Sequence, residues 1–223
     1  RLVSGLTGCK RVLITGGTGF IGTRLVAALV AGRHQVTVLT RDKSRAEDLA
    51  GPISVITDLD QVPDDERFDV VINLAGRTVN CRYTQANLKQ MMDSRVESTQ
   101  VVGQAIAQAK RPPPVWLQMS TATIYAHRFD AANDEQSGIL GGNEENVPGY
   151  WGYSVEIAKA WERALEEAPT PDTRKVALRT AMVPELDTRK TDDDFGRFIH
   201  AVPGILAVRH GLENHRDAAL DLL

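Results

Sequence analysis

Three glycines between an apolar run and an amphipathic segment constrain the fold of this chain more than any other feature. Residues 12–14 are apolar, as expected of a short buried strand in a parallel sheet. From Phe20 onward the apolar residues recur at helical spacing, so we predict a helix directly after the strand. Gly16, Gly19 and Gly22 mark the turn between the two elements.

Each of these glycines has its own task in a dinucleotide site. The first permits a tight turn, the second lets the backbone approach a pyrophosphate, and the third lets the helix pack closely on the sheet. The unpaired N–H groups and the positive dipole end of the helix would then face the phosphates. The alternative is a turn with a purely structural role. The strand-to-helix context favours the dinucleotide site.

Composition excludes several other kinds of function. The 223 residues suffice for one good core, and the net charge of −3 gives no general attraction to nucleic acid or to an acidic membrane. No apolar run is long enough to span a membrane, and residues 1–10 lack the apolar core of a signal peptide. Cys9 and Cys81 suit neither a disulfide framework nor a metal site. We expect a cytoplasmic protein that binds no nucleic acid, membrane or metal.

The rest of the chain alternates between predicted strands and helices. We predict strands over 35–39, 53–57, 70–74, 115–119 and 175–179, and long helices over 83–110 and 150–167. This order is typical of an α/β Rossmann fold, a doubly wound parallel sheet with helices on both faces. Residues 126–149 are polar and glycine-rich, and a long irregular segment of this kind is usually functional or mobile.

The end of the second predicted strand indicates which dinucleotide would bind. A ribose-binding acid is expected about 20 residues after the last glycine, and Thr40 and Arg41 stand there instead. A guanidinium can pair with a 2′-phosphate in a forked geometry, which favours NADP over NAD. Arg41 could also be a solvated surface residue, and Asp42 could still reach a ribose.

Three further features point to the same edge of the sheet. Ala75 and Gly76 follow the fourth strand and would let the backbone pass beside a ribose or adenine. Arg95 interrupts an apolar helix face, so it needs a cofactor phosphate, a buried ion pair or a path to solvent. The hydroxyls of residues 120–123 follow the fifth strand, where they would hold a substrate carbonyl or serve only in packing.

The chain resembles the extended short-chain dehydrogenase/reductases of the NAD-dependent epimerase/dehydratase family. More closely, it is similar to their atypical nucleotide-sugar epimerase branch, sometimes labelled cell division inhibitor proteins. The resemblance covers residues 10 to about 183 and rests on six motifs, at residues 15–22, 39–41, 73–76, 93–99, 120–125 and 153–162.

The resemblance implies a set of cofactor-binding residues. Thr40, Arg41 and Arg95 are expected at the NADP phosphate and ribose, Leu74 and Ala75 along the adenosine, and the Val183 backbone near the nicotinamide. The full predicted set is Gly16, Gly19, Phe20, Ile21, Gly22, Thr40, Arg41, Leu74, Ala75, Gly76, Gln90, Arg95 and Val183.

The resemblance also implies a catalytic Ser/Thr and a Tyr-x-x-x-Lys pair, in which the lysine lowers the pKa of the tyrosine. Here the tyrosine and lysine positions fall on Ser154 and Ala158, while Tyr153 and Lys159 each stand one residue away. A shift of one residue turns a side chain by about 100° around a helix, so Tyr153 and Lys159 should not converge.

The catalytic candidates are therefore substitutes for the usual residues. Thr121 matches the Ser/Thr position, and Tyr125, Tyr150 and Tyr153 are alternatives for the tyrosine. The predicted catalytic set is Thr121, Tyr125, Tyr153 and Lys159.

The last forty residues depart from the family pattern. That branch continues into a glycine-rich loop, a further strand and a small helical substrate region, and we recognise none of them after residue 183. Helices are expected over 195–202 and 211–223 instead. We predict an NADP-binding Rossmann domain over 10–183 and a truncated or atypical C-terminal segment over 184–223.

Two functions remain. The first is an NADP(H)-dependent oxidoreductase or epimerase acting on a small sugar-like substrate, for example a nucleotide-sugar. The second is a non-catalytic NADP(H)-binding sensor or interaction protein, which the altered Tyr/Lys spacing favours. The resemblance also predicts a homodimer formed through the two long helices.

Overall fold

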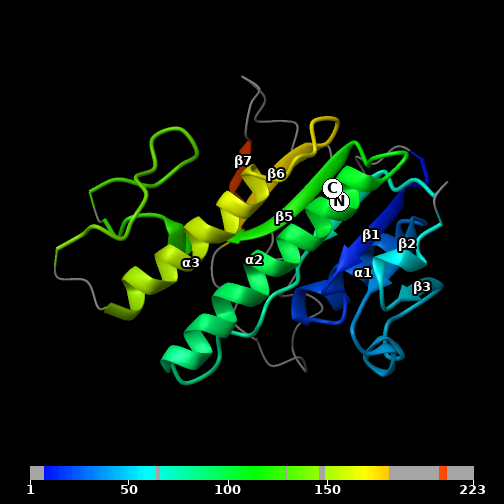
Figure 1. Cartoon of the computed structure of the whole chain (residues 1–223), viewed down its shortest axis with the longest axis horizontal. Helices are drawn as coiled ribbons and strands as arrows, with labels where there is room; N and C mark the ends of the chain where they lie inside the picture. Colours follow the sequence, from blue (N-terminus) through cyan, green and yellow to red (C-terminus); the bar gives the residue numbers. More distant parts are fainter. Residues whose placement is uncertain (1–7, 64–65, 129, 146–148, 181–205, 210–223) are drawn as a thin grey trace.

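A seven-stranded sheet forms the centre of the computed structural model, which describes residues 8–63, 66–128, 130–145, 149–180 and 206–209 (Figure 1). The strand order is β3-β2-β1-β4-β5-β6-β7, with β7 antiparallel to β6 and all other pairs parallel. The strands are β1 (Arg11–Thr15), β2 (Gln35–Leu39), β3 (Ile53–Ile56), β4 (Val70–Asn73), β5 (Val115–Thr121), β6 (Arg174–Thr180) and β7 (Leu206–Arg209).

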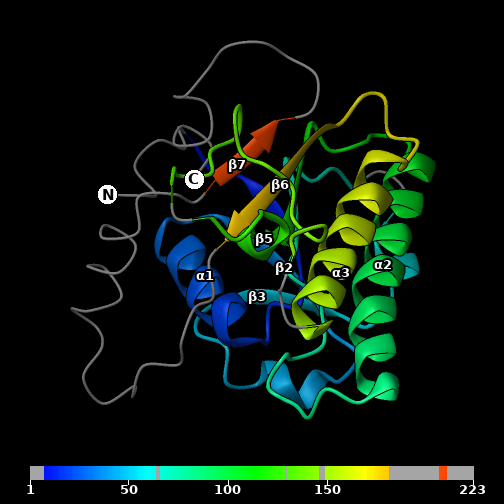
Figure 2. The same ribbon diagram turned by 90° about the vertical axis from the view of Figure 1, so that its left-hand side faces the viewer.

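Helices cover both faces of the sheet. Figure 2 shows α1 on one side and α2 and α3 side by side on the other. The helices are α1 (Phe20–Ala31), α2 (Gln85–Gln108) and α3 (Gly149–Glu166), and the short 3-10 turns are η1 (Lys43–Ala46), η2 (Leu59–Gln61) and η3 (Ala122–Ile124). The predicted doubly wound Rossmann fold is confirmed, and the strands and long helices predicted up to residue 180 agree with the observed ones to within two residues at each end.

Alternation along β1 explains why both faces are covered. Val12 and Ile14 are buried in one apolar cluster with Val26 of α1. Leu13 lies on the opposite face, in a second cluster with Val102 of α2 and Leu165 of α3. A strand buried on both faces has a continuous apolar sequence, which is why none of residues 12–14 is polar.

The order of the strands creates a switch point between β1 and β4. The chain adds β2 and β3 on one side of β1, and then adds β4, β5 and β6 on the other. In open parallel sheets of this kind, ligands bind outside the carboxyl ends of the strands at such a point. The glycine turn follows β1 directly and therefore lies at this position.

The end of the chain differs from expectation in one respect. The sequence pattern showed no strand after residue 183, but Leu206–Arg209 forms β7 and pairs with Val176–Arg179 of β6. An antiparallel edge strand on an otherwise parallel sheet is common, and a four-residue run carries too little periodicity to be recognised alone. The expected helices over 195–202 and 211–223 lie outside the described residues, and the boundary after residue 183 stays a prediction.

Hydrogen bonds hold the described parts of the long polar segment, residues 126–149, in place. Tyr125 and Leu140 form an antiparallel bridge, and the Ala126 N–H donates to the Ile139 carbonyl over 2.7 Å. The carboxylate of Glu144 accepts the N–H of His127 over 3.0 Å. Hydrogen bonds from backbone amides lower the pKa of Glu144, which favours the ionised carboxylate that accepts them.

Candidate functional site at the carboxyl edge of the sheet

The glycine turn packs against the backbone that follows β4. Gly16 has φ +71°, and a Cβ added there would lie 2.9 Å from the Leu74 carbonyl and from the Ala75 nitrogen. No side chain fits at such distances from backbone atoms, and the positive φ itself favours glycine. The turns after β1 and β4 are thus in direct contact at the switch point.

The third glycine brings the first turn of α1 against the same loop. A Cβ on Gly22 would lie 2.4 Å from the Gly16 carbonyl oxygen and 2.6 Å from the Gly17 Cα. A larger residue would push the helix away from the turn. The close packing that the sequence analysis expected of the third glycine is therefore observed.

The N-terminus of α1 has no side-chain cap. Gly19 is the N-cap residue, no side chain hydrogen-bonds there, and the first turn holds no acidic residue. The first amides of a helix have no partner inside it, so those of Phe20, Ile21 and Gly22 retain their capacity to bind an anion. Phe20 is 38% exposed beside them, and Ile21 is half-buried.

A buried polar network holds the strand ends around this turn. The Thr15 hydroxyl donates to the Asn73 side-chain oxygen, which also accepts the Ala75 N–H over 3.0 Å. The Asn73 amide donates to the Gln118 side-chain oxygen over 3.0 Å. Thr15, Asn73 and Gln118 are all buried, so the ends of β1, β4 and β5 are fixed relative to one another.

At the end of β2 the structure distinguishes the two candidate ribose ligands. The carboxylate of Asp42 accepts hydrogen bonds from the hydroxyl and the N–H of Ser44, at 2.7 and 3.0 Å, and these lower the pKa of Asp42. The Thr40 hydroxyl donates to the Asp42 carbonyl over 3.0 Å. Arg41 is exposed and forms no ion pair with a described residue. Asp42 thus caps η1, whereas the guanidinium of Arg41 has no carboxylate partner among the described residues.

Arg95 lies between the loop after β4 and α3. A Cβ on Gly76 would stand 3.5 Å from its Cγ, its guanidinium donates to the Met91 carbonyl over 3.0 Å, and its Cζ lies 5.1 Å from the ring centroid of Trp161. Burial lowers the pKa of Arg95, and no carboxylate among the described residues pairs with it. Of the three partners expected for it, the ion pair is absent from the described part of the chain.

The remaining predicted cofactor residues are less informative. Gln90 is exposed on α2, and Leu74 and Ala75 are half-buried beside Gly16. Val183 lies outside the described residues. Whether the predicted residues grip one dinucleotide stays a prediction.

The structure gives Tyr125 a structural partner. Tyr125 is 5% exposed, and its phenol oxygen accepts a hydrogen bond of 2.9 Å from Arg179, whose Cζ lies 4.9 Å from the tyrosine ring centroid. Thr121 caps η3, where its hydroxyl accepts the Thr123 N–H over 3.2 Å. Thr121 remains half-exposed at the end of β5, whereas Tyr125 is part of the core.

The other two catalytic candidates, Tyr153 and Lys159, both belong to α3 but have different neighbours. Tyr153 interacts electrostatically with Lys89 of α2. The Lys159 Nζ lies 3.5 Å from Glu156 and would be 3.3 Å from a Cβ on Gly142, in the loop before α3. The two side chains are not brought together, as the one-residue shift implied.

The remaining positions in α3 supply no replacement pair. Ser154 donates its hydroxyl to the Tyr150 carbonyl over 2.9 Å, and Ala158 is fully buried. The Tyr150 ring packs edge-on against the ring of Tyr83, which lies two residues before α2, and the two ring centroids are 6.3 Å apart.

Sequence reasoning missed an ion pair behind this edge. Arg179 of β6 makes two hydrogen bonds to the Glu162 carboxylate of α3, at 2.8 and 2.7 Å, and Glu162 also accepts the Ser120 hydroxyl. Burial disfavours a charged Arg179, but Glu162 and the Tyr125 phenol more than offset this and raise its pKa. The available signal was an arginine at the end of the predicted strand 175–179, directly after the apolar residues 176–178.

The described residues offer neither a membrane-spanning helix nor a metal cluster. None of their helices combines the length and apolar character needed to cross a membrane. Their histidines, cysteines and carboxylates form no cluster of three suited to a metal ion.

The sequence is similar to a family of epimerases and dehydratases and to proteins named as epimerase family members. The profile of the NAD dependent epimerase/dehydratase family matches residues 12–145. The epimerase family protein SDR39U1 of Bos taurus is 33% identical over 176 residues, which are 78% of this chain and 54% of that protein. An epimerase family protein of Staphylococcus epidermidis is 38% identical over 177 residues, covering 78% and 55% of the two chains.

A solved structure agrees with these matches. The human epimerase family protein SDR39U1, isoform 2, crystallised with NADPH, superposes with a TM-score of 0.59 at 31% identity, over 76% of this chain and 52% of that one. This chain thus spans about half the length of the relatives it matches. The family profile covers more than half of the chain. The chain therefore belongs to the NAD dependent epimerase/dehydratase family.

Proposed function

We propose that this chain binds NADP(H) at the glycine turn, and that the protein acts as an NADP(H)-dependent oxidoreductase or epimerase on a sugar-like substrate such as a nucleotide-sugar. The turn itself carries the proposal. Backbone contacts exclude side chains at Gly16 and Gly22, and the helix that follows starts without a side-chain cap. Uncapped helix amides at the switch point suit a pyrophosphate. The NADPH in the human SDR39U1 structure supports this cofactor.

The choice of NADP(H) over NAD(H) depends on the end of β2. Arg41 would pair with the 2′-phosphate and Thr40 would lie beside the ribose, because Asp42 is occupied by Ser44. A free acidic residue would repel the phosphate, whereas a guanidinium binds it in a forked geometry. The exposed Arg41 is therefore the specificity residue of the proposal.

The remaining family expectations complete the cofactor site. Leu74 and Ala75 would lie along the adenosine, Arg95 at the phosphate and ribose, Gln90 near the cofactor, and the Val183 backbone near the nicotinamide. When bound, the cofactor takes and returns a hydride. The chain's own contribution is to position the dinucleotide through backbone amides and to hold the substrate near Thr121.

The alternative function is a non-catalytic NADP(H)-binding sensor or interaction protein. A specific observation favours it: Tyr153 and Lys159 diverge, and the Tyr125 phenol is hydrogen-bonded to Arg179. Neither tyrosine therefore forms the Tyr-x-x-x-Lys pair that the family's proton transfer requires. Catalysis would then depend on Thr121 or on residues beyond the described part of the chain.

A pair of arginine variants tests the cofactor. We expect titration with NADPH to give a saturable fluorescence change, and Arg41→Ala to weaken that affinity about 10- to 100-fold, the value of one charge-assisted contact. NADH affinity should stay unchanged. Arg45→Ala, three residues beyond Asp42 and also exposed, removes the same charge and should leave NADPH affinity intact.

No fluorescence change at micromolar NADPH would refute both the enzyme and the binder. To separate these two, the protein is screened for cofactor turnover with nucleotide-sugars and generic carbonyl compounds. Turnover supports the enzyme, whereas tight binding without turnover supports the sensor.

We also propose a homodimer formed through α2 and α3, as the family resemblance implies. The two helices pack side by side on one face of the sheet, and Val101 of α2 is 52% exposed. Light scattering should give twice the chain mass. A monomer mass would refute the dimer without affecting the cofactor proposal.

A further inference from the structure

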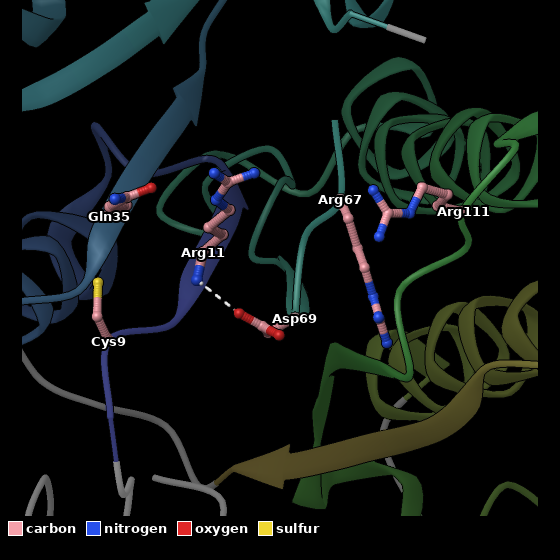
Figure 3. A pocket seen from close by; sticks show the side chains of 6 residues that line it. All are labelled: Cys9, Arg11, Gln35, Arg67, Asp69 and Arg111. Carbon is pink, nitrogen blue, oxygen red and sulfur yellow. Dashed lines mark hydrogen bonds between the residues drawn. The ribbon is translucent and has the colours of Figure 1, made fainter. Parts of the chain in front are cut away.

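A polar pocket lies at the amino edge of the sheet, opposite the glycine turn. Its volume is about 320 Å³, at the lower end of the range for small-molecule sites. Its lining residues precede or begin the strands, and Figure 3 shows them around the opening: Cys9, Arg11, Gln35, Arg67, Asp69 and Arg111. Because β1 separates this edge from the glycine turn by five residues, about 17 Å at 3.3 Å per residue, the pocket is distinct from the proposed dinucleotide site.

The topology explains why two arginines meet there. Arg67 stands three residues before Val70, which begins β4, and Arg111 stands four residues before Val115, which begins β5. Val70 and Val115 are paired in register, so the two arginines enter the same edge side by side. Figure 3 shows the side chain of Arg111 extending toward Arg67.

The carboxylates at this edge are already bound by other groups. Glu66 pairs with the Arg11 guanidinium over 2.9 Å, and Asp69 accepts the backbone N–H of Arg11 over 2.9 Å. Arg67 and Arg111 are exposed and form no ion pair with any described residue. Three arginines and one carboxylate, that of Asp69, line the pocket, so the charges of the lining sum to a positive value.

We propose that Arg67 and Arg111 bind a small phosphate-bearing molecule in this pocket. Guanidinium groups hold phosphate oxygens in a bidentate geometry, and a dianionic phosphate would relieve the repulsion between the two arginines. The volume admits a single small metabolite and excludes a folded partner. This site would bind an anion through side chains alone, whereas the proposed dinucleotide site combines the backbone amides of the glycine turn with the side chain of Arg41.

Cys9 provides a local readout, since it is exposed and lines the same pocket. In a Cys81→Ser background it is the sole cysteine. Alkylation of Cys9 by iodoacetamide is followed while inorganic phosphate replaces chloride at constant ionic strength. We expect phosphate to slow the reaction with a saturable dependence, because the anion occupies the pocket beside the thiol.

The double variant Arg67→Gln/Arg111→Gln should lose this protection, with an apparent phosphate affinity at least about tenfold weaker. Arg163→Gln, which removes an exposed arginine on α3, should retain it. Mass spectrometry assigns the modified residue, so phosphate bound at the glycine turn is not counted. Protection that is absent in the parent, unsaturable, or equal in the double variant would overturn the proposal.

Discussion

The two edges of the sheet handle charge in opposite ways. At the carboxyl edge the ion pair Arg179–Glu162 is almost enclosed, with side chains 9% and 12% exposed, and the first amides of α1 have no side-chain cap. At the amino edge the pair Arg11–Glu66 is 49% and 30% exposed, and the groups that face the pocket are side chains. The carboxyl edge is thus built into the core and tolerates little change, whereas the amino edge can change charge without disturbing the fold.

The largest test of this contrast removes one carboxylate from each pair. Glu162→Gln leaves the buried charge of Arg179 uncompensated, so we expect the free energy of unfolding to fall by about 3–5 kcal/mol. Glu66→Gln breaks an exposed pair and should change it by about 0–1 kcal/mol. Urea unfolding measures both, and equal effects would show that the two edges do not differ in this way.

A smaller difference in stability is expected between alanine variants of two helical glycines, Gly22 and Gly152. Gly22→Ala places a methyl group 2.4 Å from the Gly16 carbonyl, and overpacking of this kind should destabilise the fold by about 1–3 kcal/mol. Gly152→Ala in α3 meets no atom within 4 Å and should stabilise the fold by up to about 1 kcal/mol through helix propensity. Thermal unfolding of the two variants checks the signs. A stable Gly22→Ala protein would contradict the close packing of α1 on the turn.

The smallest effect concerns a buried group at the amino edge. His34 accepts the Lys10 N–H at Nδ1 over 3.1 Å, and burial, with the nearby charge of Lys10, lowers its pKa below the ordinary histidine value of 6.5. Below that value the unfolded chain binds a proton that the folded chain does not, so stability is full above it and falls as the pH drops toward the lowered pKa. His34→Asn keeps an acceptor for Lys10 and should lose this part of the pH dependence. An unchanged profile in unfolding titrations from pH 7 to 5 would refute the assignment.

Local patterns were sufficient to predict the sheet, the glycine turn and the long helices. The turn could be predicted because its residues are close in sequence and each glycine answers a local backbone demand. The divergence of Tyr153 and Lys159 followed from helix geometry alone. These features depend on neighbours within a few residues.

Contacts between distant segments could not be predicted. Arg179 meets Glu162 only because α3 packs against β6, and Arg179 also donates to the phenol oxygen of Tyr125, one of the predicted catalytic residues. The convergence of Arg67 and Arg111 likewise depends on the pairing of β4 with β5. β7 was missed because its four residues carry too little periodicity to be recognised without the pairing to β6.

The most direct test of the central claim is NADPH binding by Gly19→Asp. Gly19 has an extended backbone, and a Cβ there meets only the Gly16 carbonyl, at 3.2 Å, so aspartate should cap α1 with little loss of stability. Its carboxylate would occupy and repel the pyrophosphate position, which should weaken NADPH affinity about 100-fold or more.

Gly149→Asp makes the same change at the first residue of α3, where nothing lies within 4 Å, and serves as the matched control. The account predicts that fluorescence titration detects NADPH binding by the parent and by Gly149→Asp, but not by a folded Gly19→Asp protein at the same concentrations. Binding by Gly19→Asp at the parent's affinity would contradict it.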